Sequence, residues 1–88
     1  MFYTVYILYS LKDKRLYVGC TINIEKRLER HIKGFVPATK FRRPLSLIYS
    51  KNFKNKAEAF NRERFLKSLW GAREKKKILK EYLRTCFW

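Results

Sequence analysis

The stretch from Leu16 to His31, LYVGCTINIEKRLERH, constrains the fold most, because it is typical of a short strand that runs directly into a helix. From Leu16 to Thr21, successive residues alternate between two faces with the two-residue period of a strand. Asn23 then supplies an N-cap side chain for an amphipathic helix that begins near Ile24. A strand followed at once by a helix is therefore the centre of the expected fold.

Four residues in this stretch suggest chemistry. On the strand, Tyr17 and Gly19 share one face, so a phenol lies beside a position without a side chain, where a ligand or another backbone could approach. On the helix, Arg27 and His31 border an apolar stripe that repeats every four residues. The stripe consists of Ile24, Leu28 and Ile32.

The composition predicts one small folded domain with a polyanionic partner. A chain of 88 residues suffices for one modest core, so we expect a single domain over residues 1–88. Lys and Arg number 22 against 7 Asp and Glu, and the resulting net charge of +15 is most useful when the partner is nucleic acid. A solvated basic surface or binding to an anionic membrane is the alternative interpretation of this charge.

The N-terminus and the cysteines predict a cytoplasmic protein that is not inserted in a membrane. No apolar run is long enough for a transmembrane helix, and MFYTVYILYS has neither a preceding basic region nor a small-residue cleavage site. Cys20 and Cys86 are far apart and lack ligand spacing, which favours reduced thiols over a disulfide or a zinc site.

A β-hairpin is expected at the start of the chain. Phe2–Ser10 is rich in β-branched and aromatic residues, and Leu11–Arg15 is a polar break before the next strand. The register of this hairpin decides whether Tyr6 lies on the same face of the sheet as Tyr17. The two phenols share a face if the numbers of opposed residues add up to an odd value, as when Tyr6 faces Gly19, whereas an even sum separates them.

The rest of the chain predicts a loop, a strand and two helices. Gly34 is a C′ residue for the first helix. Asn55, with Glu58 three residues later, fits the capping box of a second helix that runs to about Trp70 and stops at Gly71. The other expected segments are a basic loop over Phe35–Pro44, a strand over Leu45–Phe53 and a basic third helix over Ala72–Arg84 whose apolar patch is Ile78, Leu79, Tyr82 and Leu83.

Glu63 is an irregularity in the second helix, because it falls in the centre of an apolar stripe. The stripe consists of Ala59, Leu66 and Trp70, adjoined by Phe60. Burying an unpaired carboxylate costs several kcal/mol, so Glu63 must meet a cation, a hydrogen-bond network or solvent in a cleft. Two interpretations stay open: an ion pair with Arg27 or another basic side chain, and a ligand of Mg²⁺, which one carboxylate holds together with water and phosphate oxygens.

Taken together, these residues resemble small GIY-YIG nuclease-domain proteins over nearly the whole chain. Tyr17-Val18-Gly19 stands at the second signature, and Thr4-Val5-Tyr6 stands where GIY lies, with Thr4 in place of the first glycine. Asn23, Arg27 and Glu63 follow in the family's order. The resemblance is to the compact bacterial group related to the incision subunit of nucleotide-excision repair and to GIY-YIG homing endonucleases.

The resemblance implies both a fold and an activity. The fold is α+β, with a small central three-stranded antiparallel sheet flanked by helices in the order ββαβαα. The activity is that of a metal-dependent DNA endonuclease that hydrolyses phosphodiester bonds, in DNA repair or processing. Its cofactor would be Mg²⁺ or Mn²⁺ and its partner nucleic acid, most simply DNA.

The same resemblance assigns roles to residues. Glu63 matches the metal ligand and Arg27 the catalytic arginine, whose guanidinium suits the charge of a phosphoryl transition state. Tyr6 and Tyr17 match the signature tyrosines, either of which positions or deprotonates the attacking water. His31 matches a position near the site and is predicted to be catalytic, with a packing or phosphate-contact role as the alternative. The predicted substrate contacts are Gly19, Asn23 and the loop residues Lys40, Arg42 and Arg43, which together with Arg73–Lys77 form either a track for DNA phosphates or a solvated face.

Alternatives to the nuclease hypothesis remain. A nucleic-acid-binding module of the same fold that cuts weakly or not at all has the same charge, as does a basic structural protein such as a ribosome-associated factor. Tyr6 and Tyr17 are also typical of half-buried strand aromatics. Because no groove-reading helix is evident, we expect recognition of DNA shape, ends or junctions rather than of sequence. The sequence does not decide whether Phe87 and Trp88 close the core or lie exposed.

Overall fold

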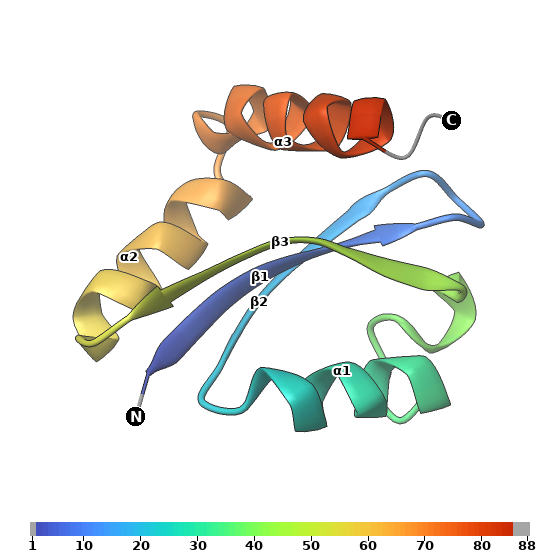
Figure 1. Ribbon diagram of the computed structural model, residues 1–88, viewed down its shortest axis with the longest axis horizontal. Helices are drawn as coiled ribbons and strands as arrows, with labels where there is room; N and C mark the ends of the chain where they lie inside the picture. Colours follow the sequence, from blue (N-terminus) through green and yellow to red (C-terminus); the bar gives the residue numbers. More distant parts are fainter. Residues whose placement is uncertain (1, 86–88) are drawn as a thin grey trace.

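The computed structural model describes residues 2–85 and contains one antiparallel sheet with helices on both of its faces (Figure 1). The elements in chain order are β1 (Tyr3–Ser10), β2 (Leu16–Thr21), α1 (Ile24–Lys33), the short 3-10 helix η1 (Lys40–Arg42), β3 (Leu45–Phe53), α2 (Lys56–Lys67) and α3 (Gly71–Thr85). The expected α+β class and the order ββαβαα are therefore confirmed. The predictions for Cys86, Phe87 and Trp88 lie outside the described residues.

β1 is the central strand, because the sheet has the order β2-β1-β3 and both pairings are antiparallel. In the hairpin, Tyr6 faces Gly19 and Leu8 faces Tyr17, so the sums of opposed residue numbers are odd. Tyr6 and Tyr17 therefore share one face of the sheet. Against β3 the register shifts between Ile7 and Leu8, an irregularity that typically bends a strand and increases its twist.

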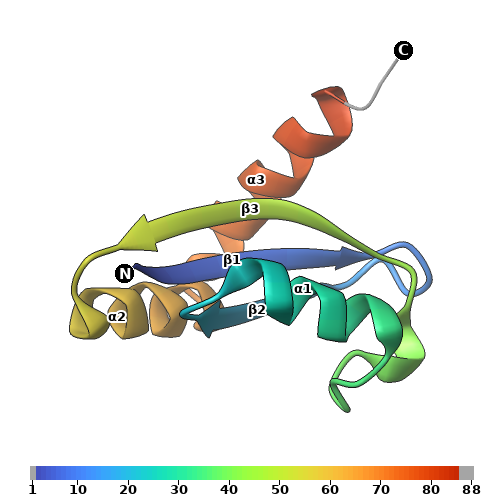
Figure 2. The same ribbon diagram turned by 60° about the horizontal axis from the view of Figure 1, so that its bottom comes forward.

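The two faces of the sheet differ in chemistry. One face packs against α2 and holds the apolar core, whose buried members are Val5, Ile7, Val18, Ala59 and Leu66. The opposite face carries Tyr6 and is covered by α1, which lies below the sheet in Figure 1, whereas α3 lies above it. Figure 2 shows α3 steeply inclined to the strands, and a hydrogen bond between the hydroxyls of Tyr82 and Ser46 joins it to β3. Alternation along β1 thus directs Val5 and Ile7 to the core and Tyr6, between them, to α1.

α2 ends earlier than predicted. The helix stops at Lys67 with Ser68 as its C-cap, and Gly71 is the first residue of α3 rather than a helix stop. The Ser68 hydroxyl donates to the Phe65 carbonyl oxygen at 2.6 Å. This bond replaces the one that the carbonyl would accept from a backbone amide in a further turn of helix. Trp70 is 83% exposed, so its predicted place in the apolar stripe of α2 is wrong.

Close helix packing explains why a glycine is found at the start of α3. A Cβ atom at Gly71 would overlap the backbone of Phe65 and Leu66 in the last turn of α2. α3 therefore begins directly against α2, at a contact that only a residue without a side chain allows.

Both ends of α1 are as predicted, but its buried side is not. The Asn23 side chain accepts a hydrogen bond from the Lys26 amide at 3.1 Å, and Gly34 ends the helix in the left-handed region with φ 82°. Ile32, however, is 63% exposed, whereas His31 is fully buried. The predicted stripe is wrong at this end because α1 packs on the sheet through a hydrogen-bonded imidazole, which the spacing of apolar residues does not indicate.

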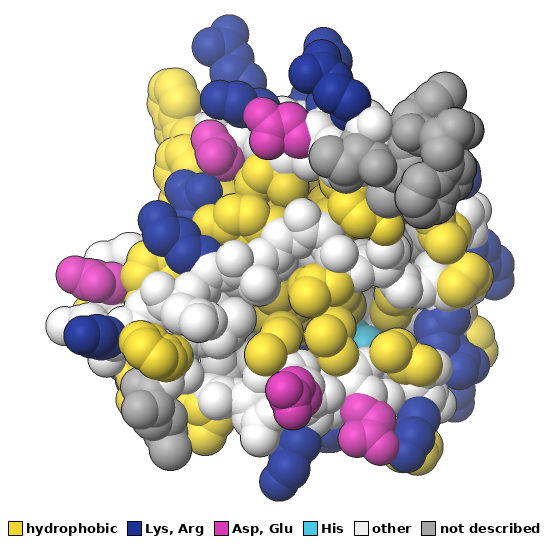
Figure 3. Space-filling model, viewed as in Figure 1, with side chains coloured by type: hydrophobic (Ala, Val, Ile, Leu, Met, Phe, Trp, Pro, Cys, Tyr) yellow, Lys and Arg dark blue, Asp and Glu magenta, His cyan; other side chains and the backbone are white. Residues whose placement is uncertain are grey.

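Most Lys and Arg side chains of the described residues have no acidic partner. On the face shown in Figure 3, Lys and Arg side chains lie around the periphery and hydrophobic side chains occupy the middle. Within residues 2–85 there are four ion pairs, so most cations of that part of the chain have no acidic partner. None of the helices in the described range is long and apolar enough to cross a membrane.

Candidate active site

Three aromatic rings meet where α1 covers the sheet. The ring centroids of Tyr6 on β1 and Tyr17 on β2 are 6.4 Å apart. The His31 ring on α1 lies 5.7 Å from that of Tyr6 and 5.2 Å from that of Tyr17, both edge to face, a favourable geometry for aromatic pairs. Tyr6 and His31 are fully buried, whereas Tyr17 is half-buried. Of the three, Tyr17 is therefore the side chain that substrate can reach.

Gly19 makes room for Tyr6 rather than for a ligand. A Cβ atom at Gly19 would overlap the hydroxyl and the adjoining ring carbon of Tyr6, which faces it across the hairpin. The space over this position is thus filled by the phenol. Gly19 accordingly contributes to the site by letting the Tyr6 side chain approach β2 closely.

The His31 imidazole is held at both nitrogens. Its Nε2 lies 3.0 Å from the Tyr6 hydroxyl, and its Nδ1 lies 2.7 Å from the hydroxyl of Thr39. A neutral imidazole donates from one nitrogen and accepts at the other, so the hydrogen bonds run either from Tyr6 through His31 to Thr39 or in the reverse direction. In both cases they join β1, α1 and the loop after α1.

Burial keeps this pair of groups neutral. Burial, reinforced by Arg27 and Arg30, lowers the pKa of His31 to about 4. Burial likewise raises the pKa of Tyr6 to about 12; Tyr17 adds to the rise, and the positive charge of Arg27 opposes it. Near neutral pH, Tyr6 is a protonated phenol and His31 a neutral imidazole. Such a pair is suited to holding a geometry rather than to removing a proton from water.

Arg27 lies at the edge of the aromatic cluster. The Asn23 cap fixes the start of α1 one turn earlier, and the guanidinium is close enough to the Tyr6 hydroxyl to oppose the rise in pKa that burial causes. Arg27 is half-buried and also lines an open cleft of about 270 Å³ that reaches α2, so its guanidinium is available to phosphate oxygens. The Asn23 side-chain oxygen accepts from Lys26, so the predicted substrate contact of Asn23 would use the amide NH₂ group.

Glu63 lies on α2, close enough to Tyr6 for its charge to act on that phenol. Its side chain is 22% exposed, and Oε2 lies 3.2 Å from Nζ of Lys67, one turn later. Within the described residues, the ion pair that the sequence left open is therefore made with Lys67 rather than with Arg27. The carboxylate adds to the effect of burial in raising the pKa of the Cys20 thiol, and it also contributes to the raised pKa of Tyr6.

The surroundings of Glu63 fit a hard divalent cation held by few protein ligands. Between residues 2 and 85 there is no cluster of three or more His, Cys, Asp and Glu side chains that could hold a metal ion. Mg²⁺ does not need such a cluster, because it keeps several waters and binds one or two carboxylates together with substrate phosphates. An i,i+4 pair with an exposed lysine is worth only ~0.3–0.5 kcal/mol, so Lys67 is easily displaced from Glu63.

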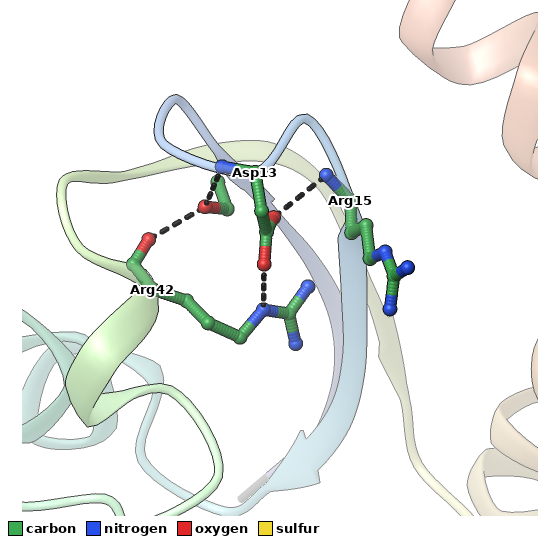
Figure 4. A network of polar contacts seen from close by, with 4 residues as sticks. Asp13, Arg15 and Arg42 are labelled. Carbon is green, nitrogen blue, oxygen red and sulfur yellow. Dashed lines mark hydrogen bonds and ion pairs between the residues drawn. The ribbon is translucent and has the colours of Figure 1, made fainter.

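The basic loop is tied to the hairpin turn through Arg42. Its Nε donates to Oδ2 of Asp13 at 2.9 Å, and Oδ1 of Asp13 accepts from the Arg15 amide at 2.9 Å (Figure 4). Desolvation acts to raise the pKa of the Asp13 carboxyl. The hydrogen bonds with the Arg15 amide, Ser10 and Arg42 outweigh it and hold this pKa below its usual value. The Arg42 guanidinium is thus used to position the loop.

Arg43 also makes contacts inside the protein, whereas Lys40 remains exposed. The Arg43 guanidinium donates to the backbone carbonyls of Lys40 and Ile32, at 3.0 and 3.3 Å. Both basic residues border a second open cleft, of about 490 Å³, which is lined by Lys12, Ile32, Lys40, Phe41, Arg43, Pro44 and Leu45. The structure therefore brings Tyr6, Tyr17, Arg27 and His31 together near Glu63, and it groups the three loop residues separately.

Sequence reasoning missed two partners of the site. Thr39 was assigned only to the basic loop, yet it is fully buried and bonded to His31; no local pattern marks it, because the contact depends on how the loop folds back. Lys67 was not named as the partner of Glu63, although their i,i+4 spacing was a usable signal.

The fold and these side chains define a class of protein, a small nuclease-type domain in which two strand tyrosines, a helical arginine and a helical glutamate surround one site. The chain belongs to the GIY-YIG family, since the model of the GIY-YIG catalytic domain matches residues 2–77. A domain of this type implies a nucleic-acid substrate. Thr4, at the first glycine position, donates from its hydroxyl to Asn52 Oδ1 on β3 at 2.8 Å, so the substitution is accommodated within the sheet.

Similar proteins belong to one group. The chain is 46% identical over 66 residues to a UPF0213 protein of Clostridium perfringens, covering 74% of this chain and 70% of that protein. It is 40% identical over 78 residues to a UPF0213 protein of Staphylococcus haemolyticus, covering 88% and 93%. The solution NMR structure of a UPF0213 protein from Bacillus halodurans is similar with a TM-score of 0.57 and 32% identity, covering 91% of this chain and 84% of that one.

Proposed function

We propose that the protein is a metal-dependent DNA endonuclease that hydrolyses a phosphodiester bond. The observation that carries this proposal is the convergence of Tyr17, Arg27 and Glu63, from three different elements, around one buried pair of Tyr6 and His31. Each of the three outer groups is only partly buried, so each can touch a bound phosphate or its attacking water. The net charge of +15 suits a polyanionic substrate.

The roles of the two tyrosines follow from their exposure. Tyr17 is half-buried and contacts the attacking water, whereas Tyr6 is buried against Gly19 and bonded to His31. We therefore assign Tyr6 and His31 as positioning residues that fix the Tyr17 ring and the nearby Arg27. Arg27 stabilises the negative charge that spreads over the phosphoryl oxygens in the transition state.

Glu63 would hold the metal ion, with water and a substrate phosphate as the other ligands. A divalent cation bound there supplies Lewis-acid stabilisation of the phosphoryl group. The role of Glu63 would then be to hold a positive charge beside the scissile phosphate. The Lys67 ammonium moves away from the Glu63 carboxylate when substrate binds.

Cleavage of labelled single-stranded, duplex, flap and branched DNA tests this proposal. We expect cleavage that requires Mg²⁺ or Mn²⁺, stops with EDTA, and falls roughly 100-fold or more in Glu63→Gln, because the change removes the negative charge that holds the metal. Binding measured in EDTA should persist in that variant. Glu29→Gln is the matched control, since Glu29 forms a similar i,i+4 pair with Lys33 on the exposed side of α1.

The alternative is a nucleic-acid-binding module that does not cut. It is favoured by the Glu63–Lys67 ion pair, which satisfies the carboxylate without a metal. Tight DNA binding with no metal-dependent cleavage of any of the four substrates would establish this alternative and refute the endonuclease proposal.

A further inference from the structure

An unassigned cleft continues from the candidate active site along α2. It has a volume of about 270 Å³, and Arg27 forms one of its walls. Ile22, from the segment between β2 and α1, lines it on the same side, and Lys56 and Phe60 line it from the first turns of α2. Because Arg27 belongs both to this cleft and to the site, whatever occupies the cleft lies next to the reacting phosphate.

The chemistry of the cleft combines an open aromatic ring with positive charge. The Phe60 side chain is 43% exposed, and Nζ of Lys56 lies 5.3 Å from the centroid of its ring. Arg27 supplies a second cation, and Ile22, 58% exposed, supplies a further apolar surface. No carboxylate lines the cleft among the described residues.

This combination fits an unpaired nucleotide. Proteins that bind single strands stack bases on aromatic side chains and bind the adjacent phosphates with cations. A base inside a duplex has both faces covered by its neighbours, so it cannot stack on Phe60 unless it leaves the helix. The cleft is too small for a duplex but open enough for one base and its sugar.

We propose that the cleft binds one unpaired nucleotide adjacent to the scissile phosphate, with Phe60 stacked on the base and Lys56 on a phosphate. The inference rests on the proposed function, because it assumes a nucleic-acid substrate at Arg27. Lys56, Phe60 and Glu63 follow one another on successive turns of α2. The bound DNA strand therefore runs along this helix toward Glu63, the proposed metal ligand. The enzyme then prefers bulges, flaps or overhangs to continuous duplex.

Equilibrium binding of labelled DNA in EDTA tests the cleft without cleavage. The probes are a fully paired duplex and the same duplex with a single unpaired base. We expect wild type to prefer the bulged duplex. Phe60→Ala should weaken binding of the bulged duplex by roughly 5- to 100-fold, the loss of one stacked base, and leave the paired duplex unchanged, while Phe60→Trp retains the preference.

A matched control is available on the same protein. Phe41 is also exposed and also has a lysine, Lys40, over its ring at 5.4 Å, but it lies away from Arg27. Phe41→Ala should leave both affinities as in wild type, and circular dichroism should show that both alanine variants are folded.

The outcomes separate the two proposals. Equal affinity of wild type for both duplexes, or a preference that survives in Phe60→Ala, would overturn the nucleotide cleft while leaving metal-dependent cleavage through Glu63 intact. A wild-type protein that neither binds nor cuts DNA would refute the endonuclease and the cleft together.

Discussion

At the scale of single residues, the site depends on a phenol that is buried over a glycine. Gly19→Ala would place a methyl group where the Tyr6 hydroxyl lies. Because Tyr6 is fully buried, its ring has no room to move aside, and we expect a loss of ~1–3 kcal/mol in the free energy of unfolding, measured with urea. DNA cleavage should fall with it.

A double variant checks the reason for this loss. Tyr6→Leu removes the hydroxyl and the ring carbons that the new methyl group would overlap, so Gly19→Ala should cost less in that background than in wild type. Additive effects of the two changes would show that the steric explanation is incorrect.

The sole histidine makes stability depend on pH. The pKa of His31 is lowered to about 4 in the folded protein, so between pH 4 and its ordinary value of 6.5 the unfolded chain binds more protons. Stability from this group is therefore present above about pH 6.5 and is lost as the pH falls, by roughly 1–1.5 kcal/mol at pH 5.5.

Urea unfolding at pH 7.5 and 5.5 measures this loss. The carboxyls with lowered pKa, Asp13 and Glu29, titrate mainly below this window, so they contribute little to the difference. His31→Gln, which does not titrate, should show a markedly smaller difference between the two pH values. An equal difference in both proteins would contradict a buried neutral imidazole.

The sequence indicated which of the candidate site residues lie together, but not how deeply they are buried. Spacing placed Arg27 and His31 together on one helix face, and the strand period placed Tyr6 with Tyr17 once the register was odd. The sequence could not show that His31 is buried and Ile32 exposed. A pattern of apolar residues treats histidine as polar, even where its imidazole is buried and hydrogen-bonded. Nor could the sequence show that Tyr6 itself fills the space over Gly19.

At the scale of elements, capping decides where Arg27 lies. Asn23→Ala removes the acceptor of the Lys26 amide at the start of α1, and we expect it to lower the free energy of unfolding by ~1 kcal/mol. Fraying of this turn should also weaken cleavage, because Arg27 lies on the next one. Asn23→Asp keeps the cap and should restore stability, as measured by thermal unfolding.

Strands were easier to predict than helix ends. Leu16–Thr21 and Leu45–Phe53 are strands with the expected bounds, because alternating β-branched and aromatic residues end at clear breaks. The end of α2 was predicted three residues too late, since Leu69 and Trp70 prolong the apolar pattern. Ser68 ends the helix through its own side chain, and these two apolar residues then lie exposed, 93% and 83%.

At the scale of the whole molecule, unpaired positive charge should govern affinity. We expect DNA binding to weaken steeply with salt, with a slope in log K against log salt of about −0.9 for each phosphate that a cation neutralises. Lys56→Gln should reduce the magnitude of this slope by about one unit, because Lys56 borders the cleft beside Arg27.

Lys33→Gln is the control for that measurement, since Lys33 is already paired with Glu29. Its slope should stay near that of wild type. Identical slopes for wild type, Lys56→Gln and Lys33→Gln would show that Lys56 does not neutralise a DNA phosphate.

The central position of β1 also limits how a protein of this kind can change over evolutionary time. Alternate residues of one strand belong to the core and to the site, so inserting or deleting a single residue inside β1 would exchange the two sets at once. Related sequences should therefore differ in length at turns such as that between β3 and α2, and never within β1. An engineer who wishes to graft a DNA-reading segment onto this domain faces the same restriction and should begin at those turns.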